Sequence, residues 1–181
     1  MSGIPLHPLV VHFPIVLVVL LPISIFVALW AVRKGATARR IWAVPLAFAT
    51  ALTLSAWVAL QTGEAEEDRV EDVVAESAIH GHEEAAERFL VLSGVLLAVA
   101  AAGLVRGPVG RAARFVTAAG AIGLVVAGAQ VGHSGGLLVY RHGAASAYAN
   151  PTPGSDRDVG RSAGTSSAVA HRDDRDDRED R

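Results

Sequence analysis

The sequence contains no cysteine among its 181 residues. This absence excludes disulfide bonds, thiolate-ligated zinc or iron–sulfur centres, and c-type haem attached through a Cys-x-x-Cys-His motif. A phosphate-binding loop ending in Lys-Ser or Lys-Thr is also missing, so nucleotide-driven transport is not expected. The formal net charge of -2 provides no basic stripe of the kind that binds nucleic acid. Cysteine-based metal and haem centres are therefore excluded, and neither nucleotide-driven transport nor nucleic-acid binding is expected.

Carboxylates are missing from most of the chain. All 18 Asp and Glu residues lie either between residues 64 and 87 or from residue 156 onward. Residues 1–63 and 88–155 have none. An ordinary soluble domain distributes both signs of charge over its surface, because that surface faces water on all sides. This segregation indicates a chain whose larger part lies away from water.

Four apolar stretches occupy the regions without carboxylates, at about residues 9–32, 41–62, 89–105 and 115–140. Each approaches or exceeds the roughly 18 residues typical of a membrane-spanning helix. The sequence therefore predicts an all-α fold, an integral membrane four-helix bundle over residues 1–149. No positive charge precedes the first stretch, which is longer than the apolar region of a signal peptide, so we expect it to remain in the mature protein. Residues 150–181 are rich in Pro, Gly, Ser, Asp and Arg and are predicted to be a disordered charged tail.

The connections between the apolar stretches differ in charge. Basic residues gather after the first and third stretches, namely Arg33, Lys34, Arg39, Arg40, Arg106, Arg111 and Arg114. The connection after the second stretch, residues 63–88, holds ten acidic residues. Short cytoplasmic loops carry the excess of Lys and Arg. The predicted location is the cell (inner) membrane, with both termini extracytoplasmic.

The acidic connection has a helical pattern of its own. Apolar residues recur at helical spacing among acidic ones between residues 64 and 77, which predicts an amphipathic helix at the outer face. Gly81 is expected to interrupt this helix. The third membrane helix would then follow, with Glu84 four residues before Arg88 in the favourable order for an ion pair.

Three glycines at intervals of four, Gly128, Gly132 and Gly136, leave one ridge of the fourth stretch without side chains. Such a ridge lets a neighbouring helix approach closely, and it also leaves room for a flat cofactor. The segment from Gly132 to Gly136 contains Ser134 and invites comparison with a nucleophile motif. The strand-turn-helix setting of that motif is absent, so a stand-alone enzyme is not expected.

Histidine is the most informative residue type. The predicted topology places six of the seven histidines at the extracytoplasmic side, namely His7, His12, His80, His82, His133 and His142. His12 lies 21 residues from Arg33, and His133 lies 19 residues from Arg114. These separations correspond to about 31 Å and about 28 Å of helix. Both imidazoles are therefore expected near the outer edge of the hydrocarbon layer, where they are costly without a partner.

Imidazoles from different helices suit a b-type haem, because its iron takes one axial ligand on each face. We therefore predict that haem b or a transition metal ion binds through four histidines, His7, His12, His133 and His142. An alternative metal site combines His80 and His82 with Glu67, since zinc, copper and iron accept nitrogen and oxygen ligands. A third interpretation needs no cofactor, because outward-facing histidines could sense pH.

Two segments carry a resemblance to a known family. The sequences HPLVVHFPI at residues 7–15 and GGLLVYRHG at residues 135–143 resemble the opening and closing signatures of an uncharacterised prokaryotic membrane family, domain of unknown function 2231. The resemblance covers about residues 5–143. It implies a four-span membrane domain without an established activity, sometimes joined to cytochrome-type modules. By position it marks His7, His12, His133 and His142.

The leading functional hypothesis is a multi-pass membrane protein whose outward-facing histidine cluster binds haem b or a metal ion for electron transfer or metal handling. Expected partners are the lipid bilayer and a periplasmic redox protein or quinone, because one site at the outer face does not carry electrons through roughly 30 Å of lipid. The alternative is a cofactor-free accessory or pH-sensing membrane subunit. The sequence does not indicate an oligomeric state.

Overall fold

The computed structural model describes residues 6–149, apart from the side chains of Arg69, Tyr148 and Ala149. In chain order the helices are α1 (Leu6–Val10), α2 (His12–Arg33), α3 (Ala38–Glu64), α4 (Glu67–Val70), α5 (Glu76–Ala102), α6 (Pro108–Tyr140) and α7 (Ser146–Ala149). Within these residues there is no strand, which confirms the predicted all-α class. The charged tail predicted at residues 150–181 lies outside the described residues.

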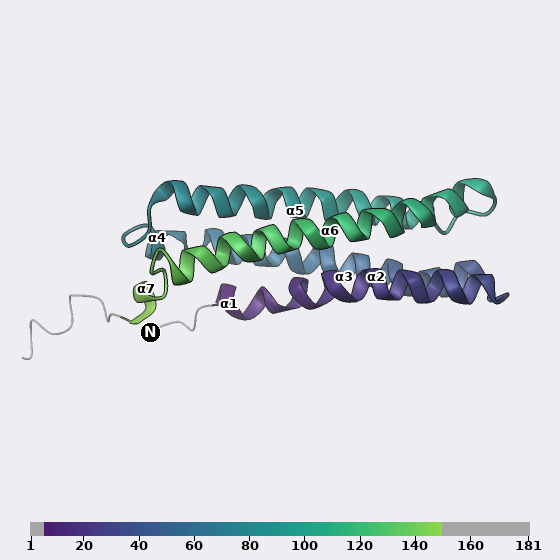
Figure 1. Cartoon of the computed structure of the whole chain (residues 1–181), viewed down its shortest axis with the longest axis horizontal. Coiled ribbons are helices and arrows are strands. Elements are labelled where there is room, and N and C mark those ends of the chain that lie inside the picture. The colour runs from purple at the N-terminus through teal and green to yellow at the C-terminus, as the bar shows by residue number, and fades with distance from the viewer. Residues whose placement is uncertain (1–5, 150–181) are drawn as a thin grey trace, which may run out of the picture. The chain divides into compact units, whose positions relative to one another are not determined.

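Helices α2, α3, α5 and α6 form a bundle in which consecutive helices run in opposite directions (Figure 1). Helix α2 packs against α3 and α6, and α5 packs against the same two helices. Together with the α1 segment that precedes α2, all four are long and apolar enough to cross a membrane. The predicted four-helix bundle is confirmed.

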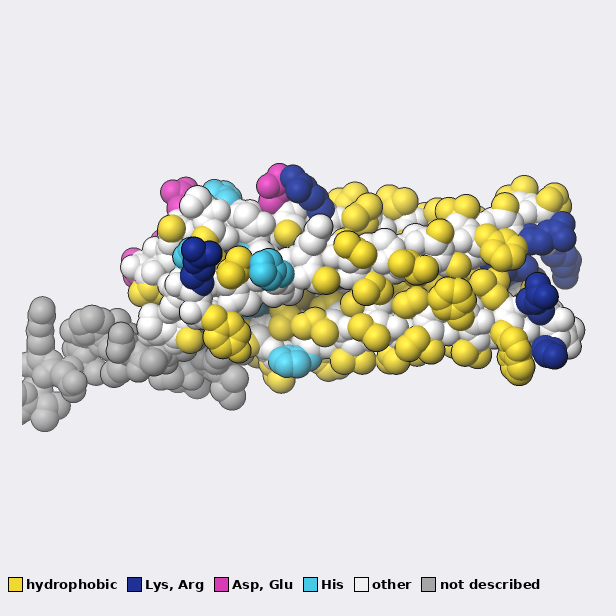
Figure 2. Space-filling view, viewed as in Figure 1, with side chains coloured by type: hydrophobic (Ala, Val, Ile, Leu, Met, Phe, Trp, Pro, Cys, Tyr) yellow, Lys and Arg dark blue, Asp and Glu magenta, His cyan; other side chains and the backbone are white. Residues whose placement is uncertain are grey.

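The core of the bundle is narrow, and most of the large apolar side chains face outward. No more than 28% of the most apolar stretch of any of the four helices is buried. Phe26, Trp30 and Phe115 are each more than half exposed. Figure 2 shows apolar side chains over the middle of the bundle. Exposing such a surface to water costs roughly 25 cal/mol per Å², a cost that lipid removes. The surface is therefore that of a membrane protein.

The two ends of the bundle differ in chemistry. The arginine end holds the α2–α3 connection (residues 34–37) and the α5–α6 connection (residues 103–107). The histidine end holds α1, the α3–α5 connection with α4, and the end of α6. Basic side chains gather at the first of these ends, and acidic and histidine side chains gather toward the second (Figure 2). The charge segregation of the sequence thus becomes a difference between the two ends of one bundle.

The single residue Val11 separates α1 from α2, and its backbone dihedral angles stay helical. Pro14 has no backbone N–H, so the carbonyl of Val10 loses the donor that a continuous helix would supply. Helix α1 packs against α3 as well as α2. This contact brings His7 to the end of α3.

Side-chain contacts fasten three helices together at the arginine end. The buried Trp42 of α3 donates its Nε1–H to the Ala100 carbonyl of α5 over 2.8 Å. Arg114 of α6 donates its Nε–H to the Gly103 carbonyl over 2.8 Å, and its guanidinium carbon lies 5.9 Å from the Trp42 ring centroid. A side chain at Gly103 would collide with the indole, because its Cβ would lie 2.2 Å from Trp42 Nε1.

The boundaries of the third and fourth membrane helices differ from the prediction. Helix α5 begins at Glu76 and continues through Gly81, so the predicted interruption there is wrong. Glycine costs a helix roughly 1 kcal/mol, which the packing of a 27-residue helix outweighs. Helix α6 begins at Pro108, because proline needs no hydrogen-bond acceptor in the first turn. The predicted ion pair between Glu84 and Arg88 is confirmed.

The glycine ridge of α6 is only partly a packing surface. A Cβ at Gly128 would lie 3.3 Å from Phe89 and 3.6 Å from Val18, so this glycine does allow a close approach. Among residues 6–149, no atom of another helix lies within 4 Å of the corresponding positions at Gly132 and Gly136. For those two glycines the predicted close approach is wrong.

Candidate functional site

Two imidazoles meet at the histidine end of the bundle. The ring centroids of His7, from α1, and His82, from α5, lie 6.4 Å apart with an interplanar angle of 83°. Both side chains are half-buried. Residues 75 positions apart in the chain thus form one imidazole pair, which we call the His7–His82 pair.

Contacts with α3 and its C-terminal connection orient His7. Its Nδ1 lies 2.9 Å from the Ala59 carbonyl oxygen and 3.4 Å from the Thr62 hydroxyl. A carbonyl oxygen only accepts hydrogen bonds, so this contact assigns the proton of a neutral imidazole to Nδ1 and the free lone pair to Nε2. The backbone N–H groups of Leu6 and His7 both donate to Glu66 Oε1, over 2.7 and 3.2 Å.

Helix α6 orients His82 in the same way. His82 Nδ1 lies 2.9 Å from the Ser134 hydroxyl oxygen. That hydroxyl donates its own hydrogen to the Val131 carbonyl over 3.0 Å, so its oxygen accepts from the imidazole. The tautomer assigned to His82 therefore also carries its proton on Nδ1 and its lone pair on Nε2.

One glycine lies against each ring of the pair. A Cβ at Gly63 would lie 3.2 Å from His7 Cε1, and a Cβ at Gly135 would lie 3.0 Å from His82 Cε1. Each glycine gives the neighbouring ring space that any other residue would reduce. Helices α3 and α6 are thus shaped to seat the two rings.

Both rings of the pair are oriented through the same nitrogen, Nδ1. Metal-binding histidines donate their second ring N–H to a fixed acceptor, which sets the tautomer and the ring orientation. Both members of the pair have such an acceptor, Ala59 for one ring and Ser134 for the other. Among residues 6–149, however, no group of three or more His, Cys, Asp or Glu side chains could hold a metal ion. The pair therefore offers two protein ligands.

The other predicted ligands lie elsewhere on the bundle surface. His12, His133 and His142 are exposed, and none of their imidazoles forms a hydrogen bond or ion pair within the described part of the chain. Of the four histidines predicted to share a cofactor, the structure brings only His7 into contact with another imidazole. Its partner is His82, which the sequence predicts in the alternative site.

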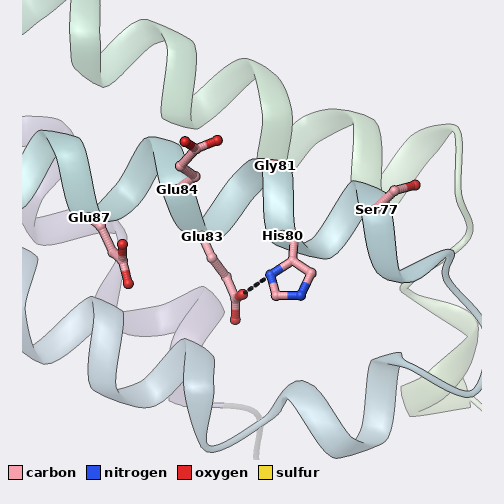
Figure 3. Close-up of a pocket in the computed structure, with 6 residues that line it drawn as sticks. All are labelled: Ser77, His80, Gly81, Glu83, Glu84 and Glu87. Atoms are coloured by element: carbon pink, nitrogen blue, oxygen red, sulfur yellow. Dashed lines mark ion pairs between the residues drawn. The ribbon is translucent and has the colours of Figure 1, made fainter.

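The alternative site is not brought together either. His80 Nδ1 lies 3.4 Å from Glu83, and its Nε2 lies 3.8 Å from Glu76. His80 lines an open hollow of about 570 Å³ on α5. In this hollow the Glu83 carboxylate points toward the His80 ring (Figure 3). His82 turns away toward α6, because residues two apart on a helix do not face each other.

Glu67, the third member of the predicted alternative site, interacts electrostatically with Glu83 and His80. The pKa of Glu67 is raised above its ordinary value, chiefly because the Glu83 carboxylate lies nearby and also because the carboxyl loses solvation. The positive charge that His80 carries when protonated acts in the opposite direction. Glu67 therefore holds its proton more tightly than a free glutamate does.

The fold and its apolar outer surface define a multi-pass α-helical membrane protein. The family described as predicted membrane protein (DUF2231) matches residues 3–147. The chain belongs to this family, as the two signature segments implied. No curated protein and no solved structure gives a match.

Proposed function

We propose that the protein binds haem b or a transition metal ion through the Nε2 atoms of His7 and His82, and that it serves electron transfer or metal handling. One observation carries the proposal. Both rings engage an acceptor through Nδ1, and this tautomer leaves the lone pair of each ring on Nε2. Two oriented lone pairs at a membrane edge suit a metal better than they suit a structural contact.

The number of ligands narrows the cofactor. A structural zinc site takes four protein ligands, and the described residues offer no group of that size. Haem iron needs only two axial ligands, because the porphyrin supplies the other four nitrogens. A copper or iron ion would fit if water or a partner molecule completed its coordination. Bound haem would supply one-electron redox chemistry, while this chain would hold the axial imidazoles in one tautomer.

The side of the membrane that the site faces is part of the proposal. Basic residues dominate the arginine end, and such residues are retained in the cytoplasm. The His7–His82 pair, at the other end of the bundle, would then face the extracytoplasmic side. From there it would exchange electrons or metal with a periplasmic protein or a quinone.

Cysteine labelling tests the orientation, because the native chain has no cysteine. Ser77 and Thr37 are both exposed and lie at opposite ends of the bundle. In spheroplasts, a membrane-impermeant maleimide should label Ser77→Cys and should leave Thr37→Cys unlabelled until the membrane is opened. Labelling of Thr37→Cys alone would reverse the proposed orientation.

Absorbance and elemental analysis test the cofactor. The protein would be purified in detergent from cells supplied with a haem precursor and transition metals. Spectra of the oxidised and dithionite-reduced protein should show a Soret band, or elemental analysis should show about one copper or iron per chain. The double variant His7→Ala, His82→Ala should lose that signal.

The matched control removes two histidines that are exposed and unbonded. The double variant His12→Ala, His133→Ala should keep the signal of the unmodified protein. If both double variants retain cofactor equally, the His7–His82 pair is not the site. If the unmodified protein carries neither haem nor metal, the cofactor-free accessory role replaces this proposal.

A further inference from the structure

A second candidate site lies at the arginine end of the bundle, opposite the end that holds the His7–His82 pair. A depression of about 430 Å³ opens between the α2–α3 and α5–α6 connections. Its volume is in the range of small-molecule sites. Four arginines line it, namely Arg39, Arg40, Arg106 and Arg114. We call this depression the arginine pocket.

No ion pair within residues 6–149 neutralises the positive charge of the arginine pocket. Residues 1–63 and 88–149 contain no Asp or Glu at all. The ion pairs within the described residues all involve residues 76–88, at the histidine end. Four guanidinium groups around one depression repel one another, so an anion in their midst would relieve that repulsion.

One of the four arginines is already fixed in place. Arg114 is half-buried, with its Nε bonded to the Gly103 carbonyl and its charge beside the Trp42 ring. Its two terminal nitrogens have no hydrogen-bond partner among the described residues. Because its rotamer is held by packing, little conformational entropy would be lost when those nitrogens bind an anion.

The starts of two membrane helices also line the pocket. Thr37 and Gly107 are the N-cap residues of α3 and α6, and both belong to the pocket lining. Neither helix has a side-chain cap bonded to its first N–H groups. Helix N-termini favour anions through these free donors and through the helix dipole.

The surrounding lipid can supply such an anion, because apolar side chains that would contact lipid lie beside the pocket. Val105, Val109 and Phe115, on and beside the α5–α6 connection, are each at least half exposed and would lie against acyl chains. We propose that the arginine pocket binds the phosphate of an anionic phospholipid headgroup. Arg114 and the two helix starts would hold the phosphate, and Arg39 and Arg106 would close over it.

Native mass spectrometry of the full chain in neutral detergent tests the proposal. Phosphatidylglycerol, phosphatidylcholine and inorganic phosphate would be titrated separately. Phosphatidylglycerol should bind the unmodified protein at least about tenfold more tightly than phosphatidylcholine. The variant Arg39→Gln, Arg106→Gln should lose that preference by about tenfold or more. Both residues are exposed and unbonded, so the variant should elute and melt like the unmodified protein.

The matched control is Arg33→Gln, Arg111→Gln, which removes the same charge from exposed positions outside the pocket lining. It should keep the preference for phosphatidylglycerol. Equal losses in both double variants would mean diffuse attraction to a charged surface and would overturn the proposal. Binding of inorganic phosphate as tight as that of the lipid, with the same dependence on the variants, would replace the lipid with a free anion. No preference for phosphatidylglycerol in the unmodified protein would also overturn it.

Discussion

Replacing Gly135 with valine is expected to lower haem or metal occupancy by about ten- to a hundredfold, the usual effect of disturbing a group that orients a ligand. A Cβ at this position would lie 3.0 Å from His82 Cε1, and the methyl groups of valine would reach further. The ring would have to leave Ser134, and with that bond the orientation of Nε2 would be lost. Occupancy per chain, measured by absorbance and elemental analysis, reports the effect.

The adjacent glycine supplies the control for this substitution. Within the described part of the chain, no atom of another helix lies within 4 Å of a Cβ at Gly136. Gly136→Val therefore places the same side chain one position along α6 without touching His82. Occupancy in Gly136→Val should stay close to that of the unmodified protein. Equal losses in the two variants would mean that α6 tolerates no bulk here, and the seating of His82 by Gly135 would be wrong.

Replacing Gly110 with alanine is expected to destabilise the bundle by about 3 kcal/mol, at the upper end for overpacking. The added Cβ would lie 1.8 Å from the Val105 carbonyl oxygen. That oxygen belongs to the backbone of the α5–α6 connection, so relief requires the whole turn to move. Unfolding by increasing fractions of a denaturing detergent, followed by circular dichroism, measures the loss.

Gly123 in the same helix is the matched position. Nothing lies within 4 Å of a Cβ there, so Gly123→Ala should raise stability by roughly 0.5–1 kcal/mol through better helix propensity. Opposite signs for the two Gly→Ala variants would confirm the tight α5–α6 turn. If Gly110→Ala is as stable as Gly123→Ala, the turn described here is incorrect.

The fold follows from the sequence because lipid imposes simple constraints. The absence of carboxylates outside residues 64–87 and the tail marks the helices that cross the membrane, and each must satisfy its own backbone hydrogen bonds. The helix boundaries are harder to predict from the sequence. Gly81 looks like an interruption in the sequence, yet helix packing carries α5 through it.

The site was only partly predictable. Gathering of the histidines at one end follows from topology alone, since the connections alternate between the two ends of the bundle. Which imidazoles meet depends on how each helix is rotated about its own axis. Apolar periodicity predicts that rotation weakly when both faces of a helix are apolar. The sequence around Ser134 suggests only a comparison with a nucleophile motif, whereas in the structure its hydroxyl orients His82. The one feature of the sequence that could have indicated this role is that Ser134 lies next to Gly135 in the fourth apolar stretch.

X-ray absorption spectroscopy of the loaded protein tests the central claim most directly, because it counts the imidazoles bound to the metal. We expect two imidazole nitrogens per metal atom at about 2.0 Å in the unmodified protein. A single imidazole should remain in His7→Ala and in His82→Ala, while His142→Ala should keep both. Two imidazoles persisting in the double variant His7→Ala, His82→Ala would contradict the account.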